Sequence, residues 1–138
     1  MGKKGFRPVK QVIVMRRGLN NGRGKEIVQG SHSVGDFIFK QITGTKSTVK
    51  ITSEELQWIQ TGTKKVCTQV PGEKELLEVY EAAKKAGLTV KLVIDAGLTN
   101  AGSGKGNPTK TCISIGPNYE DEIDKITGKG GSHPLKLY

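Results

Sequence analysis

Cysteine, aromatic residues and long apolar runs are scarce in this chain of 138 residues. Its two cysteines, Cys67 and Cys112, have no cysteine or histidine nearby at zinc-finger spacing, so we expect two buried, reduced thiols and no zinc site of that kind. No apolar stretch approaches the roughly 18 residues of a membrane span, and residues 1–10 contain no signal-peptide core. We therefore expect a cytoplasmic protein that neither crosses a membrane nor is secreted.

Acidic residues are also few. The 13 aspartates and glutamates face 22 lysines and arginines, which gives a formal net charge of +9. A domain this basic commonly binds a polyanion, and nucleic acid is the leading candidate. Charge alone leaves two alternatives open, namely an ordinary solvated basic surface and a domain that docks on an acidic protein.

Common nucleotide and nucleophile motifs are absent. In "GRGKE", Glu26 follows Lys25 where a P-loop needs Ser or Thr, and Ile27 replaces the last glycine of a dinucleotide-binding pattern. The stretch "GSGKG" at 102–106 fails the P-loop test as well. No Gly-x-Ser-x-Gly elbow occurs, and neither cysteine fits a nucleophile pattern. If the chain is a hydrolase, the sequence favours water as the nucleophile over a covalent intermediate.

Hydrophobic periodicity predicts alternating strands and helices. Residues 43–52 are polar and fit neither pattern. Ser53 is the expected N-cap of a short helix. We expect strands at 11–16, 64–70, 88–95 and 109–115, and helices at 25–42, 53–61, 73–86 and 119–127. In the first helix, the expected core-facing side comprises Ile27, Ser31, Val34, Ile38 and Ile42. In the third helix it comprises Leu76, Leu77, Tyr80 and Ala83.

This order predicts an α/β fold: one three-layer domain over 11–138, with helices on both faces of a mixed sheet of about four strands, after a flexible basic N-terminus at 1–10. Ligands of such sheets bind beyond the carboxyl ends of the strands. The loop 17–24 and the turn that begins at Asp95 both follow predicted strands. We therefore expect these two segments to lie side by side.

One face of the predicted first helix carries a polar stripe. At about 100° per residue, Lys25, Gln29, His32 and Asp36 fall on one narrow side of the helix. Lys25 lies in the first turn, where free backbone N–H groups already favour an anion. Together with Arg23 and the glycine-rich backbone, it could bind a phosphate or a developing oxyanion. The alternative interpretation is an ordinary solvated stripe.

Asp95 directly follows an apolar strand, where a carboxylate can act as a base or orient another group. Thr99 and Thr111 supply hydroxyl groups in the neighbouring segments. The alternative role of Asp95 is to cap the turn through hydrogen bonds to its own backbone. The sequence pattern leaves both roles open.

Six ordered blocks, "VIVMRRGL", "GRGKEIVQGSH", "GLTVKLVIDAGLT", "TKTCISIGP", "IDKITG" and "LKLY", closely resemble the type 2 peptidyl-tRNA hydrolases over residues 10–138. The resemblance implies cleavage of the ester between a peptide and the 3′ ribose of tRNA, with no metal or organic cofactor. Matched by position, the family's functional residues are Lys25, Gln29, His32, Asp95, Thr99 and Thr111. The resemblance leaves open whether the chain forms a homodimer.

The resemblance leads to a mechanistic hypothesis. Asp95, through Thr99 or Thr111, positions a water molecule, and Lys25 stabilises the oxyanion or binds a phosphate. His32 and Gln29 hold the acceptor end, while Arg16, Arg17, Arg23 and Lys105 supply tRNA affinity.

Some positions depart from the family pattern. Gly18 stands where an acidic residue is usual, and Asn21 and Arg23 replace Met and Lys. Gly30 stands where the family prefers Cys or a small apolar residue, and Ser33 stands where it prefers Ala. The chain is longer at 100–107 and at 129–134. Gly18 and the longer stretch at 100–107 motivate a rival hypothesis, in which the chain is a tRNA- or RNA-binding module that has lost hydrolysis.

Overall fold

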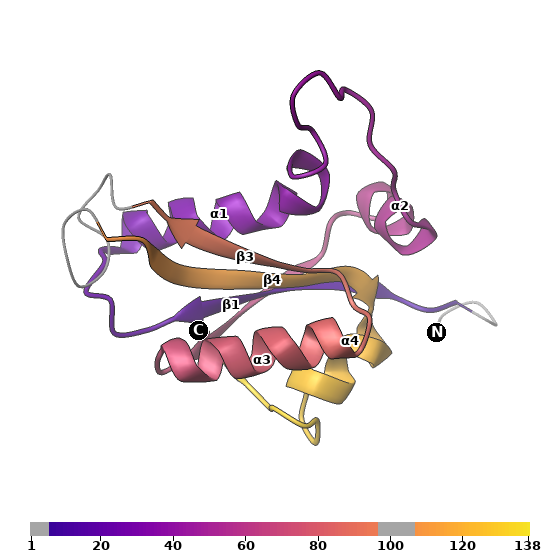
Figure 1. The fold of residues 1–138 in the computed structure, drawn as a ribbon. Coiled ribbons are helices and arrows are strands. Elements are labelled where there is room, and N and C mark those ends of the chain that lie inside the picture. Colours follow the sequence, from indigo (N-terminus) through magenta and orange to yellow (C-terminus); the bar gives the residue numbers. More distant parts are fainter. Residues whose placement is uncertain (1–5, 97–106) are drawn as a thin grey trace.

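The computed structural model describes residues 6–96 and 107–138 (Figure 1). Strands and helices alternate along the chain as the periodicity predicted. In chain order the elements are β1 (Val9–Arg16), α1 (Arg23–Phe39), α2 (Ser53–Gln60), β2 (Lys65–Val70), α3 (Glu73–Lys85), β3 (Val90–Asp95), β4 (Thr109–Tyr119), α4 (Glu120–Thr127) and β5 (Lys136–Leu137).

The strands form one mixed sheet in the order β3-β4-β1-β2-β5. Strand β1 pairs parallel with β2 and antiparallel with β4, which in turn pairs antiparallel with β3. As a result β1, β2 and β3 all run in the same direction. The loop after β1 and the carboxyl end of β3 therefore lie at the same end of the sheet. The predicted juxtaposition of these two segments is confirmed.

Helices cover both faces of the sheet, α1 and α2 on one side and α3 and α4 on the other (Figure 1). The predicted three-layer α/β fold is therefore confirmed. The sheet has five strands instead of about four, because the C-terminal block "LKLY" pairs with β2 through Leu137 and Lys136. Strand β5 is too short to show a period in the sequence.

Alternation along β1 divides the core into two sides. Val12 and Val14 face α3 and α4, where they pack in the largest apolar cluster with residues such as Leu76 and Ile123. Met15 faces the other way, toward Val93 and Cys112. A strand with both faces covered must be apolar on both sides, which explains the unbroken run "VIVM".

The predicted core side of α1 is confirmed only in part. Val34 and Ile38 pack against a buried cluster that includes Phe37 and Trp58, whereas Ile27, Ser31 and Ile42 are exposed. Ile27 is 65% exposed and Ile42 is 49% exposed. The helix instead buries Gln29, Gly30, Ser33 and Phe37. The physical reason is that β4 presents polar groups to this side of α1: the Cys112 thiol and the Ser114 hydroxyl donate to helix carbonyls. Ile42 lies beyond the last helical residue, Phe39.

Several helix and strand boundaries differ from the predictions; for example, α1 ends at Phe39 and β4 continues to Tyr119. Helix α2 is capped by Thr52 and not by Ser53: the Thr52 side chain accepts from the Glu55 N–H and the Glu55 side chain accepts from the Thr52 N–H, a capping box. Strand β1 begins at Val9, which is buried, instead of at residue 11. The folded part therefore extends into the segment expected to be a flexible N-terminus.

Two burial predictions are also corrected. Strand β3 was expected to be buried, but it lies at the edge of the sheet, and Ile94 is 52% exposed. Cys67 is exposed, whereas Cys112 is buried as expected, and both thiols are free. Cys67 is exposed because α1 leaves that face of β2 uncovered.

Replacing Gly116 by alanine should destabilise the fold much more than replacing Gly130. Both glycines have positive φ, +97° and +82°, a conformation that costs an L-residue about 1–2 kcal/mol. At Gly116 the new Cβ would also lie 2.6 Å from the Lys10 carbonyl, while nothing lies within 4 Å at Gly130. Urea unfolding should show an additional loss of about 1–3 kcal/mol for Gly116→Ala. Equal losses would contradict this packing account.

Candidate active site

The polar stripe of α1 lines a cavity of about 810 Å³ between that helix and β3. Four of the residues that the sequence singled out line this cavity, namely Lys25, Gln29, His32 and Asp95, together with Asp36 of the same stripe. The residues that line it are Gly24, Lys25, Val28, Gln29, His32, Asp36, Lys40, Leu92, Val93, Ile94, Asp95 and Ala96. The stripe is therefore not an ordinary solvated face.

A hydrogen bond between Gln29 and Asp95 connects the helix to the end of β3. The Gln29 Nε2 donates to Asp95 Oδ2 at 3.0 Å, and both residues are buried, at 6% and 8% exposure. Thr111 lies directly behind them at 1% exposure, its Oγ1 3.4 Å from Gln29 Oε1 and 3.3 Å from the Val93 carbonyl. A neutral amide that donates to a carboxylate favours the ionised form and fixes its orientation.

Side chains of β4 hold α1 in place through the helix backbone. The Cys112 thiol donates to the Gln29 carbonyl at 3.4 Å, and the Ser114 hydroxyl donates to the Ser33 carbonyl at 2.8 Å. Burial raises the pKa of the Cys112 thiol to about 12. That cysteine is therefore a neutral donor near pH 7 and not a nucleophile.

Lys25 lies at the amino end of the same helix. Helix α1 begins at Arg23, and its N-cap residue, Gly22, provides no side-chain hydrogen bond. The first-turn N–H groups and the partly buried Lys25 therefore offer positive charge at one end of the cavity. With the Asp95 carboxylate at the strand end and His32 on the next turns of the helix, the cavity combines an anion site with a candidate general base.

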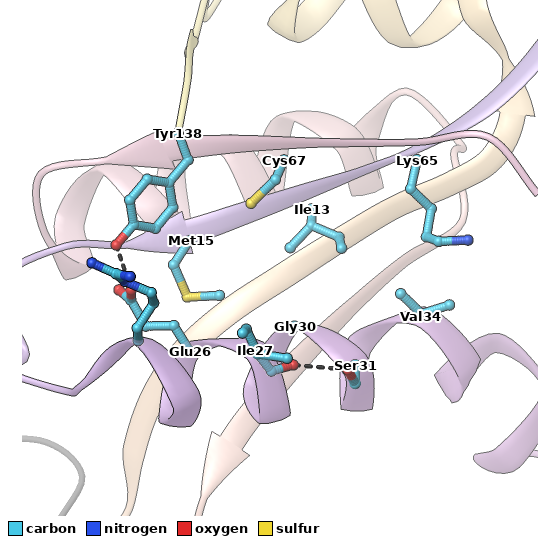
Figure 2. Close-up of a pocket in the computed structure, with 11 residues that line it drawn as sticks. Ile13, Met15, Glu26, Ile27, Gly30, Ser31, Val34, Lys65, Cys67 and Tyr138 are labelled. Atoms are coloured by element: carbon cyan, nitrogen blue, oxygen red, sulfur yellow. Dashed lines mark hydrogen bonds between the residues drawn. The ribbon is translucent and has the colours of Figure 1, made fainter.

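Arg23 and Lys25 do not share a cavity, although the sequence suggested a joint phosphate site. Arg23 lines a second cavity of about 800 Å³ on the opposite side of α1, between the helix and the strands β1 and β2. Figure 2 shows its apolar wall, with Ile13 and Met15 of the sheet above Ile27 of the helix. Tyr138 closes one end and donates a hydrogen bond to Glu26, which raises the pKa of Tyr138.

The two other basic residues near the loop have protein partners. Arg16 donates to the Lys110 carbonyl at 3.0 Å and to Glu73 at 3.2 Å, so it connects the end of β1 to β4 and α3. Arg17 donates to Gln69 and lies over the ring of Tyr138, 4.5 Å from its centre. Arg17 is exposed, whereas the Arg16 side chain is only 19% exposed.

Gly18 does not line the cavity that holds Asp95. It has a φ of +83° and lines a third cavity together with Val70, Pro71 and His133. A missing carboxylate at this position therefore leaves the contacts of Gln29 and Asp95 unchanged. Thr99 and Lys105, which the sequence also singled out, lie outside the described residues.

The sequence did not predict the contacts of Cys112 and Ser114 with the helix backbone. It also did not predict that Lys40 and Leu92 line the cavity. Neither motif nor periodicity pointed to these residues. Among residues 6–96 and 107–138, no helix has the length and apolar character needed to cross a membrane. The same residues include no group of three or more His, Cys, Asp or Glu side chains that could hold a metal ion.

Comparison with known proteins places this chain in a family. The family model described as peptidyl-tRNA hydrolase PTH2 matches residues 9–136. The peptidyl-tRNA hydrolase of Methanopyrus kandleri is 42% identical over 120 residues, which cover 86% of this chain and 93% of that protein. That of Methanothermobacter thermautotrophicus is 42% identical over 123 residues, 87% of this chain and 96% of that protein.

A eukaryotic relative is also similar. The mitochondrial peptidyl-tRNA hydrolase 2 of Bos taurus is 36% identical over 130 residues, which cover 94% of this chain and 64% of that protein. The chain belongs to the peptidyl-tRNA hydrolase PTH2 family. The resemblance drawn from the six sequence blocks is confirmed.

Proposed function

We propose that this chain is a peptidyl-tRNA hydrolase whose reaction centre is the cavity between α1 and β3. Its family and the names of its relatives support hydrolysis of the ester bond of peptidyl-tRNA. One structural observation carries the assignment of the site: the buried hydrogen bond from Gln29 to Asp95 lies in the same cavity as Lys25 and His32.

In the proposed reaction, Asp95 accepts a proton from a water molecule as that water attacks the ester carbonyl. Gln29, itself in contact with Thr111, keeps the carboxylate ionised and aimed into the cavity. The carbonyl oxygen becomes an oxyanion, which Lys25 and the first-turn N–H groups of α1 stabilise. The tetrahedral intermediate then expels the 3′ oxygen of the ribose, which takes the proton from Asp95. The products are tRNA with a free 3′ hydroxyl and a peptide carboxylic acid, which loses its proton to solvent and becomes a carboxylate.

Several roles are proposed for the surrounding residues. His32 donates a hydrogen bond to the acceptor end of the tRNA, because it lines the cavity from an exposed position. Arg17, Arg23 and Lys105 bind tRNA phosphates, while Arg16 contributes less because the protein already satisfies part of its guanidinium. A cytoplasmic location fits this function, and the homodimer stays a prediction.

The rival hypothesis of a binding module without hydrolysis loses one of its two reasons. Gly18 lines a cavity formed with β2 and α3, so its departure from the family pattern does not disturb Gln29 or Asp95. Five polar residues expected in the reaction centre lie together in the described part of the chain: Lys25, Gln29, His32 and Asp95 line the cavity, and Thr111 contacts Gln29. This observation favours the enzyme over the binding module.

Release of the acyl group from N-acetylaminoacyl-tRNA should depend on Lys25 and Asp95. We expect Lys25→Ala and Asp95→Asn each to lower kcat by about 100- to 1000-fold, because each loses charge stabilisation in the transition state. Matched controls are Lys129→Ala and Asp121→Asn, which alter exposed residues far from the cavity. Binding of the tRNA by the wild type without release of the acyl group would favour the binding module instead.

Binding of tRNA should weaken steeply as salt rises, because contacts with phosphates release counterions. In a plot of log affinity against log salt, Arg23→Ala should make the slope shallower by about 0.7–0.9, the contribution of one phosphate contact. Lys125→Ala provides the control, since Lys125 is exposed on α4, which covers the opposite face of the sheet from α1. A slope that Arg23→Ala leaves unchanged would remove Arg23 from the tRNA surface.

A further inference from the structure

The cavity of the reaction centre lies against the outer edge of β3. An unbroken run from Leu92 to Ala96 borders it. Side chains of a strand alternate between the two faces, so a cavity on one face alone would touch every second residue. An unbroken run indicates contact with the edge, where main-chain groups are accessible. Among the described residues no strand covers this edge, because β3 is the first strand of the sheet.

Main-chain groups at this edge point into the cavity. The Leu92 carbonyl accepts a hydrogen bond from Lys40 Nζ at 3.0 Å, so this carbonyl faces away from β4. The pairing of β3 with β4 shifts register between Val93 and Ile94, but the extra residue, Thr111, belongs to β4. Neighbouring residues of β3 therefore still point their N–H and C=O groups in opposite directions, so Ile94 faces outward as Leu92 does. Lysine side chains commonly shield free sheet edges. Lys40 is exposed, so it can leave this position without crossing packed structure.

We propose that the outer edge of β3, from Leu92 to Asp95, binds the peptide part of peptidyl-tRNA as an added β-strand. The inference rests on the proposed function, since it needs the ester to lie at Asp95. The ester is formed by the carboxyl end of the peptide, and Asp95 is the carboxyl end of β3. A peptide that extends from Asp95 back toward Leu92 therefore runs parallel to β3.

Parallel pairing specifies the hydrogen bonds. The peptide residue opposite Val93 donates its N–H to the Leu92 carbonyl and accepts from the Ile94 N–H, whereas its neighbours point away from β3. Main-chain bonds of this kind do not depend on the peptide's sequence. The apolar side chains of Val28 and Ile94, 53% and 52% exposed, flank the edge and offer contact to side chains of any apolar type.

The length of the edge sets the length of peptide that benefits. At roughly 3.3 Å per residue, the run from Asp95 back to Leu92 spans about 10 Å. A single blocked amino acid does not reach Leu92, whereas a peptide of about four residues does. We therefore expect tetrapeptidyl-tRNA to be cleaved with a kcat/KM about 3- to 10-fold above that of N-acetylaminoacyl-tRNA.

The first test uses the wild-type protein and tetrapeptidyl-tRNAs that carry one N-methyl group each, at the second, third or fourth residue from the ester. Spontaneous hydrolysis in buffer is subtracted for each substrate. N-methylation removes one main-chain donor, so kcat/KM should fall about 3- to 10-fold at one of these positions and change less than about twofold at its immediate neighbours. A uniform effect at all positions, or none at any, would overturn the inference.

The second test compares Ile94→Pro with Ile94→Ala, because both lose the isoleucine side chain and only proline loses the outward N–H. Because Ile94 lines the reaction-centre cavity, each variant is compared with itself, through the ratio of kcat/KM for tetrapeptidyl-tRNA to kcat/KM for N-acetylaminoacyl-tRNA. This ratio should fall to about one in Ile94→Pro and stay at about 3- to 10-fold in Ile94→Ala. Identical behaviour of the two folded variants would overturn the inference, and if Ile94→Pro does not fold, the N-methyl series decides alone. Wild-type protein that cleaves none of the substrates would instead overturn the hydrolase proposal, and this inference with it.

Discussion

The buried hydrogen bond between Gln29 and Asp95 is the contact on which the site depends. A carboxylate at 8% exposure is costly to ionise in an apolar surrounding, and the amide donor offsets part of that cost without adding a second ionisable group. The bond also joins α1 to an edge strand, which would otherwise be held on one side only. One interaction therefore both prepares a charged group for chemistry and fixes the wall of the cavity in which that chemistry takes place.

This polar contact determines how α1 lies on the sheet. Gln29 reaches Asp95 only if the helix turns its polar and small residues inward, and Gly30 and Ser33 allow that close approach. Cys112 and Ser114 then bond to the helix backbone where aliphatic side chains would otherwise pack. Ile27 turns outward as a consequence and lines the second cavity together with Met15 (Figure 2). The two cavities are thus two results of a single helix orientation.

The sequence predicted much of the fold and of the site. The predictions failed mainly where the outcome depends on contacts between segments that are distant along the chain. The alternation of strands and helices predicted the fold, and the carboxyl ends of β1 and β3 predicted where Lys25 and Asp95 meet. The rule that apolar residues face the core failed for Ile27, because β4 presents polar groups to that part of α1. It failed for Ile42 because the helix ends before it, at Phe39. Periodicity also could not show that β3 is an edge strand, since its order in the sheet follows from pairing with β4, a contact between distant segments.

The rate of Gln29→Met under saturating peptidyl-tRNA tests most directly whether Gln29 prepares Asp95 for the reaction. Methionine preserves most of the volume of glutamine but cannot donate to the carboxylate, so Asp95 remains present and loses its orientation. We expect kcat to fall about 100-fold with little change in KM, as for a misplaced reacting group, while thermal unfolding shows that the variant is folded. A folded Gln29→Met protein with the kcat of the wild type would contradict the account.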